Sequence, residues 1–378
     1  MNTMNFAELK LFITGPTFLR EAVRQAGLLP EFGHRDSENK KRFESIFGNL
    51  KKLAQVGDGY QVVLFNGSGS SAMEASIRSL VADEEVVLNV SVGAFGDLYH
   101  KMAVVNGKKA VQLKFEPGSA IDLAALKKAL AEHKPGVVTC THNETSTGVT
   151  NDIKAVCAAV REAGAMPLVD GVSIFGGAAV AIEAAGAAMY STSTQKSLGL
   201  PAGFGIGFIA KAALDKAKNV KNRGFATDIV GQAASAEKFQ TLTTPNCTLA
   251  NQMAVQLDWI VNGEGIENRF ARHEKMRAMA HAWVAAQDGL SLFAPEGHRS
   301  ATLTAVKTSG GMSVARLKKA KEAMRAKGYL FDPGYGKLNT QLEEKGKDPL
   351  FRIGHMGDIT PQMLEAFLAD LREVLKTA

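Results

Sequence analysis

Three short motifs place reactive or anion-binding groups directly after apolar runs that predict strands. The first is the turn Phe65–Ala72, which combines two glycines with three serines. The second is Asp170, at the end of the apolar run that begins at Met166. The third is Lys196, which lies among small hydroxyl residues and glycines in Ser191–Gly205. These three motifs offer anion binding, carboxylate chemistry and amine chemistry.

The turn Phe65–Ala72 is suited to binding an anion. A glycine-rich turn before a helix presents free backbone N–H groups and the positive end of the helix dipole, and Ser68, Ser70 and Ser71 add hydroxyl donors. The turn also fits the G-x-G-x-x-A form of a dinucleotide site, but the next predicted strand, Val86–Val90, lacks the acidic residue at its end that such a site needs. No Gly-Lys-Ser/Thr follows, which excludes a Walker loop. A turn without any ligand remains the alternative.

Asp170 and Lys196 each have a functional and a structural interpretation. Asp170 stands at the predicted carboxyl end of a strand, where ligands bind in open α/β folds, but an aspartate there can also cap a helix or join a buried polar network. The small neighbours of Lys196 leave room for a bulky group against the backbone, and lysine forms Schiff bases with carbonyl compounds. A solvated loop lysine is the alternative. Neither residue alone distinguishes a functional role from a structural one.

The pattern of apolar residues predicts the elements that position these groups. Between Gln61 and Phe208, short apolar runs alternate with amphipathic helical patterns. Two of the helices are predicted over Met73–Val81 and over Asn151–Gly164, the latter capped by Asn151 or Thr150 at its start and by Gly164 at its end. Such units build a parallel or mixed sheet with helices on both faces. The predicted buried strands are Gln61–Phe65, Val86–Val90, Ala110–Phe115, Val137–Cys140 and Met166–Val169.

After Pro245 the pattern changes to that of a smaller α+β domain. A long helical stretch, Leu249–Ala285, precedes strands near Ala301–Lys307 and Leu350–Ile353 and a last helix over Pro361–Lys376. We predict an N-terminal segment over residues 1–13, a large α/β domain over 14–255 and a small α+β domain over 256–378.

Composition excludes several classes of function. The chain has 378 residues, 46% of them hydrophobic, without a run of about 18 apolar residues, so no membrane span is predicted. The net charge is +6, but the basic residues are spread out, so we expect no nucleic-acid partner. Met1–Lys10 lacks the pattern of a signal peptide. Cys140, Cys157 and Cys247 show no paired spacing, so we expect neither disulfides nor a bound metal, and a cytoplasmic location.

Taken together, the motifs resemble those of class V, fold-type I pyridoxal-phosphate enzymes, above all alanine–glyoxylate, serine–glyoxylate and phosphoserine aminotransferases. Asp170 and Lys196 lie 26 positions apart. The resemblance implies an α/β fold-type I transferase, with a mostly parallel, seven-stranded-type sheet in the large domain and a smaller α+β C-terminal domain. The motifs that occur in the family's order are Thr14-Gly15-Pro16, Gly33-His34-Arg35, Gly67-Ser68-Gly69, His142–Gly148, Val169-Asp170, Gln195-Lys196 and Phe351–Gly354.

The resemblance also implies how pyridoxal 5′-phosphate is bound. Lys196 is expected to hold the cofactor as a Schiff base and to move the substrate proton, and Asp170 is expected to keep the ring nitrogen protonated. The other expected contacts are Phe95 stacked on the ring, Thr145 at the phenolic oxygen, Ser68, Gly69, Ser70 and Gln195 at the phosphate, and Thr243 at the phosphate of the partner subunit.

For the substrate, the resemblance implies that Arg352 clamps the carboxylate as a bidentate pair, with a surface salt bridge as the alternative. Gly15 and Arg35 complete the expected substrate-binding set. The implied enzyme is a homodimer with shared active sites. It moves an amino group between a small amino acid (serine, alanine or phosphoserine) and a 2-oxo acid (glyoxylate, pyruvate or 2-oxoglutarate).

Three other functions stay open at this point. One is a 2-aminoethylphosphonate transaminase, a near neighbour in the same family. Another is a cysteine desulfurase-like lyase, which needs a nucleophilic cysteine in the C-terminal half, where none follows Cys247. The third is a non-catalytic binding protein on the same scaffold. That protein is expected to have lost Lys196 or Asp170, and both are present.

Overall fold

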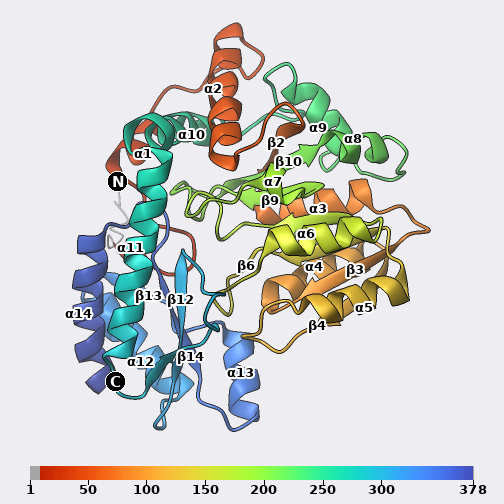
Figure 1. Cartoon of the computed structure of the whole chain (residues 1–378). Helices are drawn as coiled ribbons and strands as arrows, with labels where there is room; N and C mark the ends of the chain where they lie inside the picture. Colours follow the sequence, from red (N-terminus) through yellow and green to blue (C-terminus); the bar gives the residue numbers. More distant parts are fainter. Residues whose placement is uncertain (1–8, 378) are drawn as a thin grey trace.

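A computed structural model describes residues 9–377 of the chain. The expectation for Met1–Lys10 and most of the predicted segment 1–13 thus lie outside the described residues. The largest element is a seven-stranded sheet, whose neighbouring strands are parallel except where β10 runs antiparallel to β2 and β9. Its order across the sheet (Figure 1) is β2 (Tyr60–Gly67), β10 (Gly203–Ala210), β9 (Met189–Ser193), β8 (Met166–Asp170), β5 (Val137–Thr141), β3 (Val86–Ser91) and β4 (Lys109–Lys114). The expected α/β fold with a mostly parallel sheet is confirmed.

All five strands predicted for the large domain are present, each within two residues of its predicted ends. β9 and β10 were not delimited in advance, because β9 carries three hydroxyl residues and β10 three glycines. One of these glycines has a clear reason. A Cβ on Gly205 would lie 2.4 Å from the backbone oxygen of Ser68, so only glycine lets the turn before α3 approach the sheet this closely.

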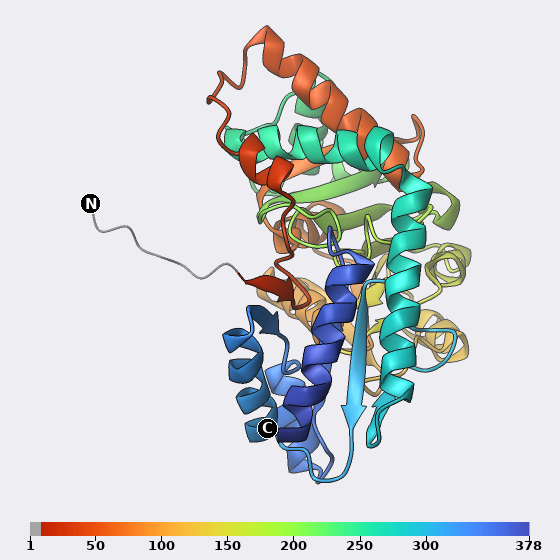
Figure 2. The same cartoon turned by 90° about the vertical axis from the view of Figure 1, so that its left-hand side faces the viewer.

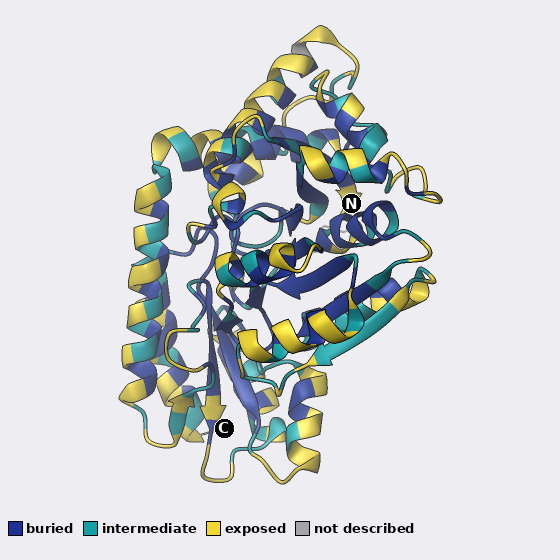
Figure 3. Cartoon of the chain, turned by 45° about the vertical axis from the view of Figure 1, so that its right-hand side comes forward, coloured by how far each residue is buried: buried dark blue, intermediate teal, exposed yellow. Residues whose placement is uncertain are grey.

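Helices cover both faces of the sheet. α4 (Ala94–Val105) and α5 (Leu123–His133) both pack on β3 and β4 from opposite faces, with α3 (Gly69–Leu80) beside α4 and α6 (Ile153–Glu162) beside α5. Figure 3 shows the result: the central strands are buried, the edge strand β4 is partly exposed, and the helices are exposed on their outer sides. The remaining elements of this part are α1 (Glu21–Ala26), α2 (Ser37–Ala54), α7 (Ile182–Ala185), α8 (Lys211–Ala217), α9 (Ile229–Ala236), α10 (Cys247–Asp258), β6 (Asn143–Glu144) and β7 (Val149–Thr150).

Two helix boundaries differ from prediction. α3 begins at Gly69, four residues before the predicted start at Met73, so the glycine-rich turn supplies the first turn of the helix itself. α6 is capped by Asp152, whose side chain accepts a hydrogen bond from Ala155 N at 3.0 Å. Asn151, the predicted cap, is occupied elsewhere: it accepts from Ile121 N and donates to the Thr141 carbonyl.

The C-terminal part has its own sheet and its own core (Figure 2). The predicted long helix is interrupted: α10 ends in a π-helical turn at Trp259–Gly263, and α11 (Ile266–Ala285) starts after Gly265, which has a φ of +84°. β1 (Lys10–Phe12) crosses into this part and pairs with β13 (Tyr329–Phe331). The other elements are β11 (Leu290–Leu292), β12 (Leu303–Thr308), β14 (Leu350–Gly354), α12 (Val314–Ala326), α13 (Gly336–Glu344) and α14 (Pro361–Thr377).

Buried apolar side chains form two clusters. The first extends from Val23 to Ile260, and the second combines Phe12 with residues between Met276 and Val374. The first cluster continues past residue 256 to Ile260, so the boundary between residues 255 and 256 stays a proposal. Within the described range, no helix is both long enough and apolar enough to cross a membrane.

Candidate active site

The carboxyl ends of β8 and β9 bring the two central groups together. These strands are parallel neighbours, with Asp170 opposite Ser191 in the register. Asp170 is the last residue of β8, and Lys196 follows β9 by three residues. The amino end of α3 lies at the same edge of the sheet because β2, which precedes it, ends there. This edge is where open α/β folds bind ligands.

Asp170 is a buried carboxyl group with an altered acidity. Its side chain is 3% exposed, and its Oδ1 accepts a hydrogen bond from Val172 N at 2.9 Å. Burial raises the pKa of Asp170 to about 7 and outweighs the lowering effect of that bond and of Lys196, while Glu144 adds to the rise. A cationic ring N–H placed at the free Oδ2 would favour the charged carboxylate. The group therefore fits the expected role toward the ring nitrogen.

Lys196 has an amine that is easily deprotonated. Burial lowers the pKa of Lys196 to about 8, and the Arg352 charge adds to the lowering while Asp170 and Asp332 oppose it. Its Nζ donates to the Thr14 carbonyl. Gly15 lies against the same side chain: it has a φ of +109°, and a Cβ there would come within 2.6 Å of Lys196 Cδ. The neutral amine is the form that attacks carbonyl compounds, and the lowered pKa increases its share near neutral pH.

The turn between β2 and α3 has the features of an anion cradle. Ser68 is the N-cap of α3 and makes no side-chain cap bond. Ser71 N donates to the Ser68 carbonyl, which leaves the N–H groups of the first two helical residues for a ligand. Gly69 leaves no room for a side chain, because a Cβ would lie 2.4 Å from Val172 Cγ2. Beside it, Ser193 Oγ is buried without a hydrogen-bond partner. This unpaired hydroxyl can donate a hydrogen bond to a bound phosphate.

Arg352 on β14 is buried, so its ion pair is not a salt bridge at the protein surface. Its Nη1 donates to the Thr145 carbonyl at 2.8 Å, and its Nη2 pairs with Asp332 at 3.0 Å. Asp332 is held in turn by Thr14 Oγ1 at 3.2 Å and by Gly334 N at 3.0 Å. The Arg352 Nε is buried without a partner. The Nε edge is therefore available for a carboxylate, as a bidentate clamp requires.

The aromatic wall of the site comes from α4 and α13. Phe95 is the second residue of α4, and its ring lies 6.4 Å from the ring of Tyr335. The Arg352 guanidinium lies 5.9 Å from the centre of the Tyr335 ring. Tyr335 thus contacts both the expected stacking residue and the expected carboxylate clamp.

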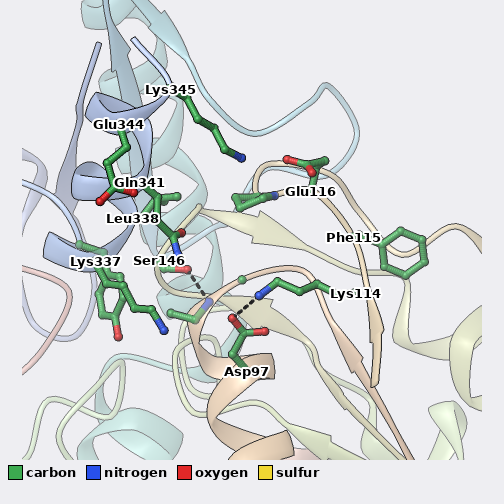
Figure 4. A pocket seen from close by; sticks show the side chains of 14 residues that line it. Asp97, Lys114, Phe115, Glu116, Ser146, Lys337, Leu338, Gln341, Glu344 and Lys345 are labelled. Carbon is green, nitrogen blue, oxygen red and sulfur yellow. Dashed lines mark hydrogen bonds and ion pairs between the residues drawn. The ribbon is translucent and has the colours of Figure 1, made fainter. Parts of the chain in front are cut away.

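A cavity of about 600 Å³ adjoins this wall, between α4, the end of β4 and α13 (Figure 4). Several charged side chains line it: Lys114 pairs with Asp97 at 2.7 Å on one side, and Lys337 and Lys345 approach from α13 and the residue after it. Ser146, next to Thr145 in the chain, lines it as well. Tyr335 also lines the cavity, whereas Lys196 and Arg352 do not.

Two predicted residues are not gathered with the others. Thr243 Oγ1 accepts a hydrogen bond from Asn66 at 3.1 Å, just before the anion cradle and within the same chain. Arg35 is exposed just before α2, and no contact with Lys196, Asp170 or Arg352 is found in the described part of the chain. A single chain therefore leaves the roles of Thr243 and Arg35 as predictions.

Sequence reasoning missed several residues of the site. Glu144 and Ser193 lie inside motifs that had been singled out, so their position was known but their function was not. Asp332 and Tyr335 belong to an Asp-Pro-Gly-Tyr sequence that is typical of a turn. Nothing in that sequence links them to Arg352 or Phe95, which lie in other parts of the chain.

Comparison with known proteins identifies the family. The model of the family described as "Aminotransferase class-V" matches residues 25–324. The chain belongs to the class V aminotransferases. It is therefore a pyridoxal-phosphate-dependent transaminase, as its motifs implied.

Individual relatives cover nearly the whole chain. It is 31% identical to an uncharacterized aminotransferase of Methanocaldococcus jannaschii over 97% of this chain and 92% of that protein. It is 30% identical to the serine–glyoxylate aminotransferase of Hyphomicrobium methylovorum over 97% and 89% of the two chains. The crystal structure of alanine–glyoxylate aminotransferase from Nostoc sp. superposes with a TM-score of 0.90 at 25% identity, covering 99% and 97%.

Proposed function

We propose that this aminotransferase moves an amino group between a small amino acid and a 2-oxo acid, with pyridoxal 5′-phosphate held by Lys196. The proposed donors are serine, alanine or phosphoserine, and the proposed acceptors are glyoxylate, pyruvate or 2-oxoglutarate. The relatives that are named for serine, alanine and glyoxylate support this choice. The observation that carries the proposal is the convergence of Lys196, Asp170 and Arg352. Thr14 links the lysine to the arginine, since its carbonyl accepts from Lys196 Nζ and its hydroxyl donates to Asp332, the ion-pair partner of Arg352. Both Arg352 and Asp170 alter the pKa of Lys196.

Each of these residues has a task that its environment supports. The partly neutral Lys196 amine can take a proton from the substrate Cα and return it. Arg352 offers the Nε edge to the substrate α-carboxylate, since Asp332 and the Thr145 carbonyl hold the other edges. At the buried end of the site, the Asp170 carboxylate would accept a hydrogen bond from the protonated ring nitrogen of the cofactor. The bound cofactor supplies the electron sink that makes this proton removal possible.

The phosphate is proposed to lie on the amino end of α3. The N–H groups after Ser68 and the Ser193 hydroxyl support this placement. Gln195 remains a predicted contact, because its unpaired atom is the acceptor Oε1. We further propose a homodimer with shared sites, in which Thr243 serves the phosphate of the partner subunit. Within its own chain Thr243 accepts a hydrogen bond from Asn66, so its role toward the partner rests on the family resemblance.

The proposal is tested by a panel of half-reactions. Each candidate amino acid is added alone to the purified holoenzyme, while the absorbance of the lysine-bound cofactor and the 2-oxo acid product are followed. We expect serine, alanine or phosphoserine to react and to give the matching 2-oxo acid. A holoenzyme that binds the cofactor but reacts only with large amino acids would overturn the substrate assignment.

A further inference from the structure

Glu144, which has no part in the proposed proton transfer, is a fully buried carboxylate with both oxygens occupied. It ends β6 and has an exposed fraction of 0%. Its Oε1 accepts from Ser146 N at 3.0 Å and from Ser146 Oγ at 2.6 Å. Its Oε2 accepts from Phe95 N at 3.0 Å and from Gly96 N at 3.2 Å. A carboxylate that accepts four hydrogen bonds is fixed in position and has no free oxygen for substrate.

The backbone N–H groups that donate to Glu144 Oε2 belong to the first turn of α4. Phe95 and Gly96 are the second and third residues of α4, whose first N–H groups need partners from outside the helix. The N-cap residue is Gly93, which has no side chain, and a Cβ there would lie 2.6 Å from Glu144 Cγ. Ser146 Oγ accepts from Ala94 N at 3.1 Å. The capping of α4 is thus supplied by the segment 144–146, from a distant part of the chain.

This cap joins three parts of the site. Thr145 lies between the two capping residues, and its carbonyl accepts from Arg352 Nη1 at 2.8 Å. Phe95, at the other side of the cap, carries the ring that is expected to stack on the cofactor. A negative charge at the amino end of α4 is also favoured by the helix dipole.

We infer that Glu144 is a positioning residue that fixes the Phe95 ring relative to Thr145 and, through the Thr145 carbonyl, to Arg352. The inference rests on the proposed function, because it assigns the fixed groups to the cofactor and to the substrate carboxylate. Glu144 acts only through other residues. Its loss should therefore loosen the cofactor site before it affects the rest of the fold.

Glu144→Gln is the sharpest variant. It keeps the size of the side chain but replaces one acceptor oxygen by an NH₂ group, so either the Phe95–Gly96 pair or the Ser146 pair must face a donor. Asp122→Asn is the matched control: Asp122 caps α5 away from the site through one oxygen, which accepts from Ala125 N at 2.7 Å. An asparagine there can keep that bond.

Two readouts are needed on the full-length protein. The first is the exchange of the Phe95 and Gly96 amides with deuterium in the cofactor-free state, and the second is the dissociation constant of pyridoxal 5′-phosphate with the visible circular dichroism of the bound cofactor. For Glu144→Gln we expect faster exchange at the start of α4, a weaker dichroic band and binding weakened about tenfold or more, as a buried polar group left unpaired implies. Asp122→Asn should leave all three unchanged.

The outcomes separate the two proposals. Unchanged amide exchange and unchanged affinity in a folded Glu144→Gln protein would overturn the role of Glu144. If that variant does not fold, Ser146→Ala, which removes the Ala94 acceptor and one bond to Glu144, should give the same pattern in smaller measure, and an unchanged pattern would overturn the inference. Failure of the wild-type protein to bind cofactor on Lys196 would instead overturn the proposed function, while amide exchange would still report on the cap.

Discussion

The two ends of the site are built on opposite principles. At the sheet edge, Lys196 and Asp170 have few hydrogen bonds and pKa values that burial shifts to about 8 and about 7. In the C-terminal part, Arg352 is held by Asp332 and by the Thr145 carbonyl, and Asp332 is itself held by two further donors. One region is arranged so that protons can move near neutral pH. The other is arranged so that charge and geometry stay constant, which is what recognition of a carboxylate needs.

Lys196→Ala should have the largest effect, because it removes both the attachment point and the proton-transfer group. We expect loss of the visible absorbance of bound cofactor and a fall in half-reaction rate of about 10⁴-fold or more. Lys211→Ala, at an exposed position in α8, serves as the control. Borohydride reduction and peptide mapping of the wild-type holoenzyme should label Lys196, and a label on another lysine would contradict the assignment.

Asp170→Asn should reduce turnover about 10²- to 10³-fold with the fold intact. The amide cannot hold the ring nitrogen in its protonated form, so the electron sink is weaker. Single-turnover half-reactions with bound cofactor measure the loss directly. Near-normal rates would show that the buried carboxyl group serves packing alone.

Arg352→Lys should cost about 10- to 100-fold in kcat/KM for every α-carboxylate substrate, since an ammonium cannot form the planar clamp. Asp332→Asn tests whether Arg352 depends on its ion pair with Asp332, and we expect a smaller loss of kcat/KM for the same substrates. Steady-state kinetics with two donors of different side chains are the measurement. A loss confined to one donor would assign Arg352 to side-chain recognition instead.

The contrast also predicts a pH dependence of folding. The pKa of Asp170 is raised from 3.8 to about 7, so the folded cofactor-free protein binds the proton more tightly than the unfolded chain. Stability gained from this group is present below pH 3.8 and is lost as the pH rises toward about 7. Denaturant unfolding at pH 5 and pH 8 should therefore show that wild type loses stability relative to Asp170→Asn at the higher pH. Parallel curves would mean that the carboxyl group is charged throughout.

Thr243→Ala should have the smallest effect, a several-fold weaker binding of cofactor with unchanged half-reaction rates at saturation. The hydroxyl is one donor among several for the proposed phosphate site. Cofactor titration measures the change, and sedimentation of the holoenzyme tests the proposed dimer. A fully active monomer would contradict the shared site.

The sequence was informative where chemistry and periodicity coincide. The runs before Phe65 and Asp170 were buried and bounded by polar turns, so both the strands and their ligand-binding ends could be predicted. β10 was not predicted because its three glycines interrupt the alternation of apolar and polar residues that is typical of a strand. The start of α3 was missed because glycine and serine have low helix propensity. Asp332 was unpredictable for another reason: its partner Arg352 pairs with it across an isolated bridge, and no local pattern reports a contact between distant strands.

The segment that follows β1 has a consequence for how the enzyme matures. Thr14 supplies the carbonyl that receives Lys196 Nζ, and its hydroxyl donates to Asp332, 318 positions further along the chain. During synthesis, the sheet edge with Lys196 emerges long before Asp332 and Arg352, and β1 has no partner until β13 has been made. Non-local closure of this kind is slow compared with local folding. In nascent chains Lys196 should therefore reach the position in which it can bind the cofactor only at the end of translation, when the first and last parts of the protein meet.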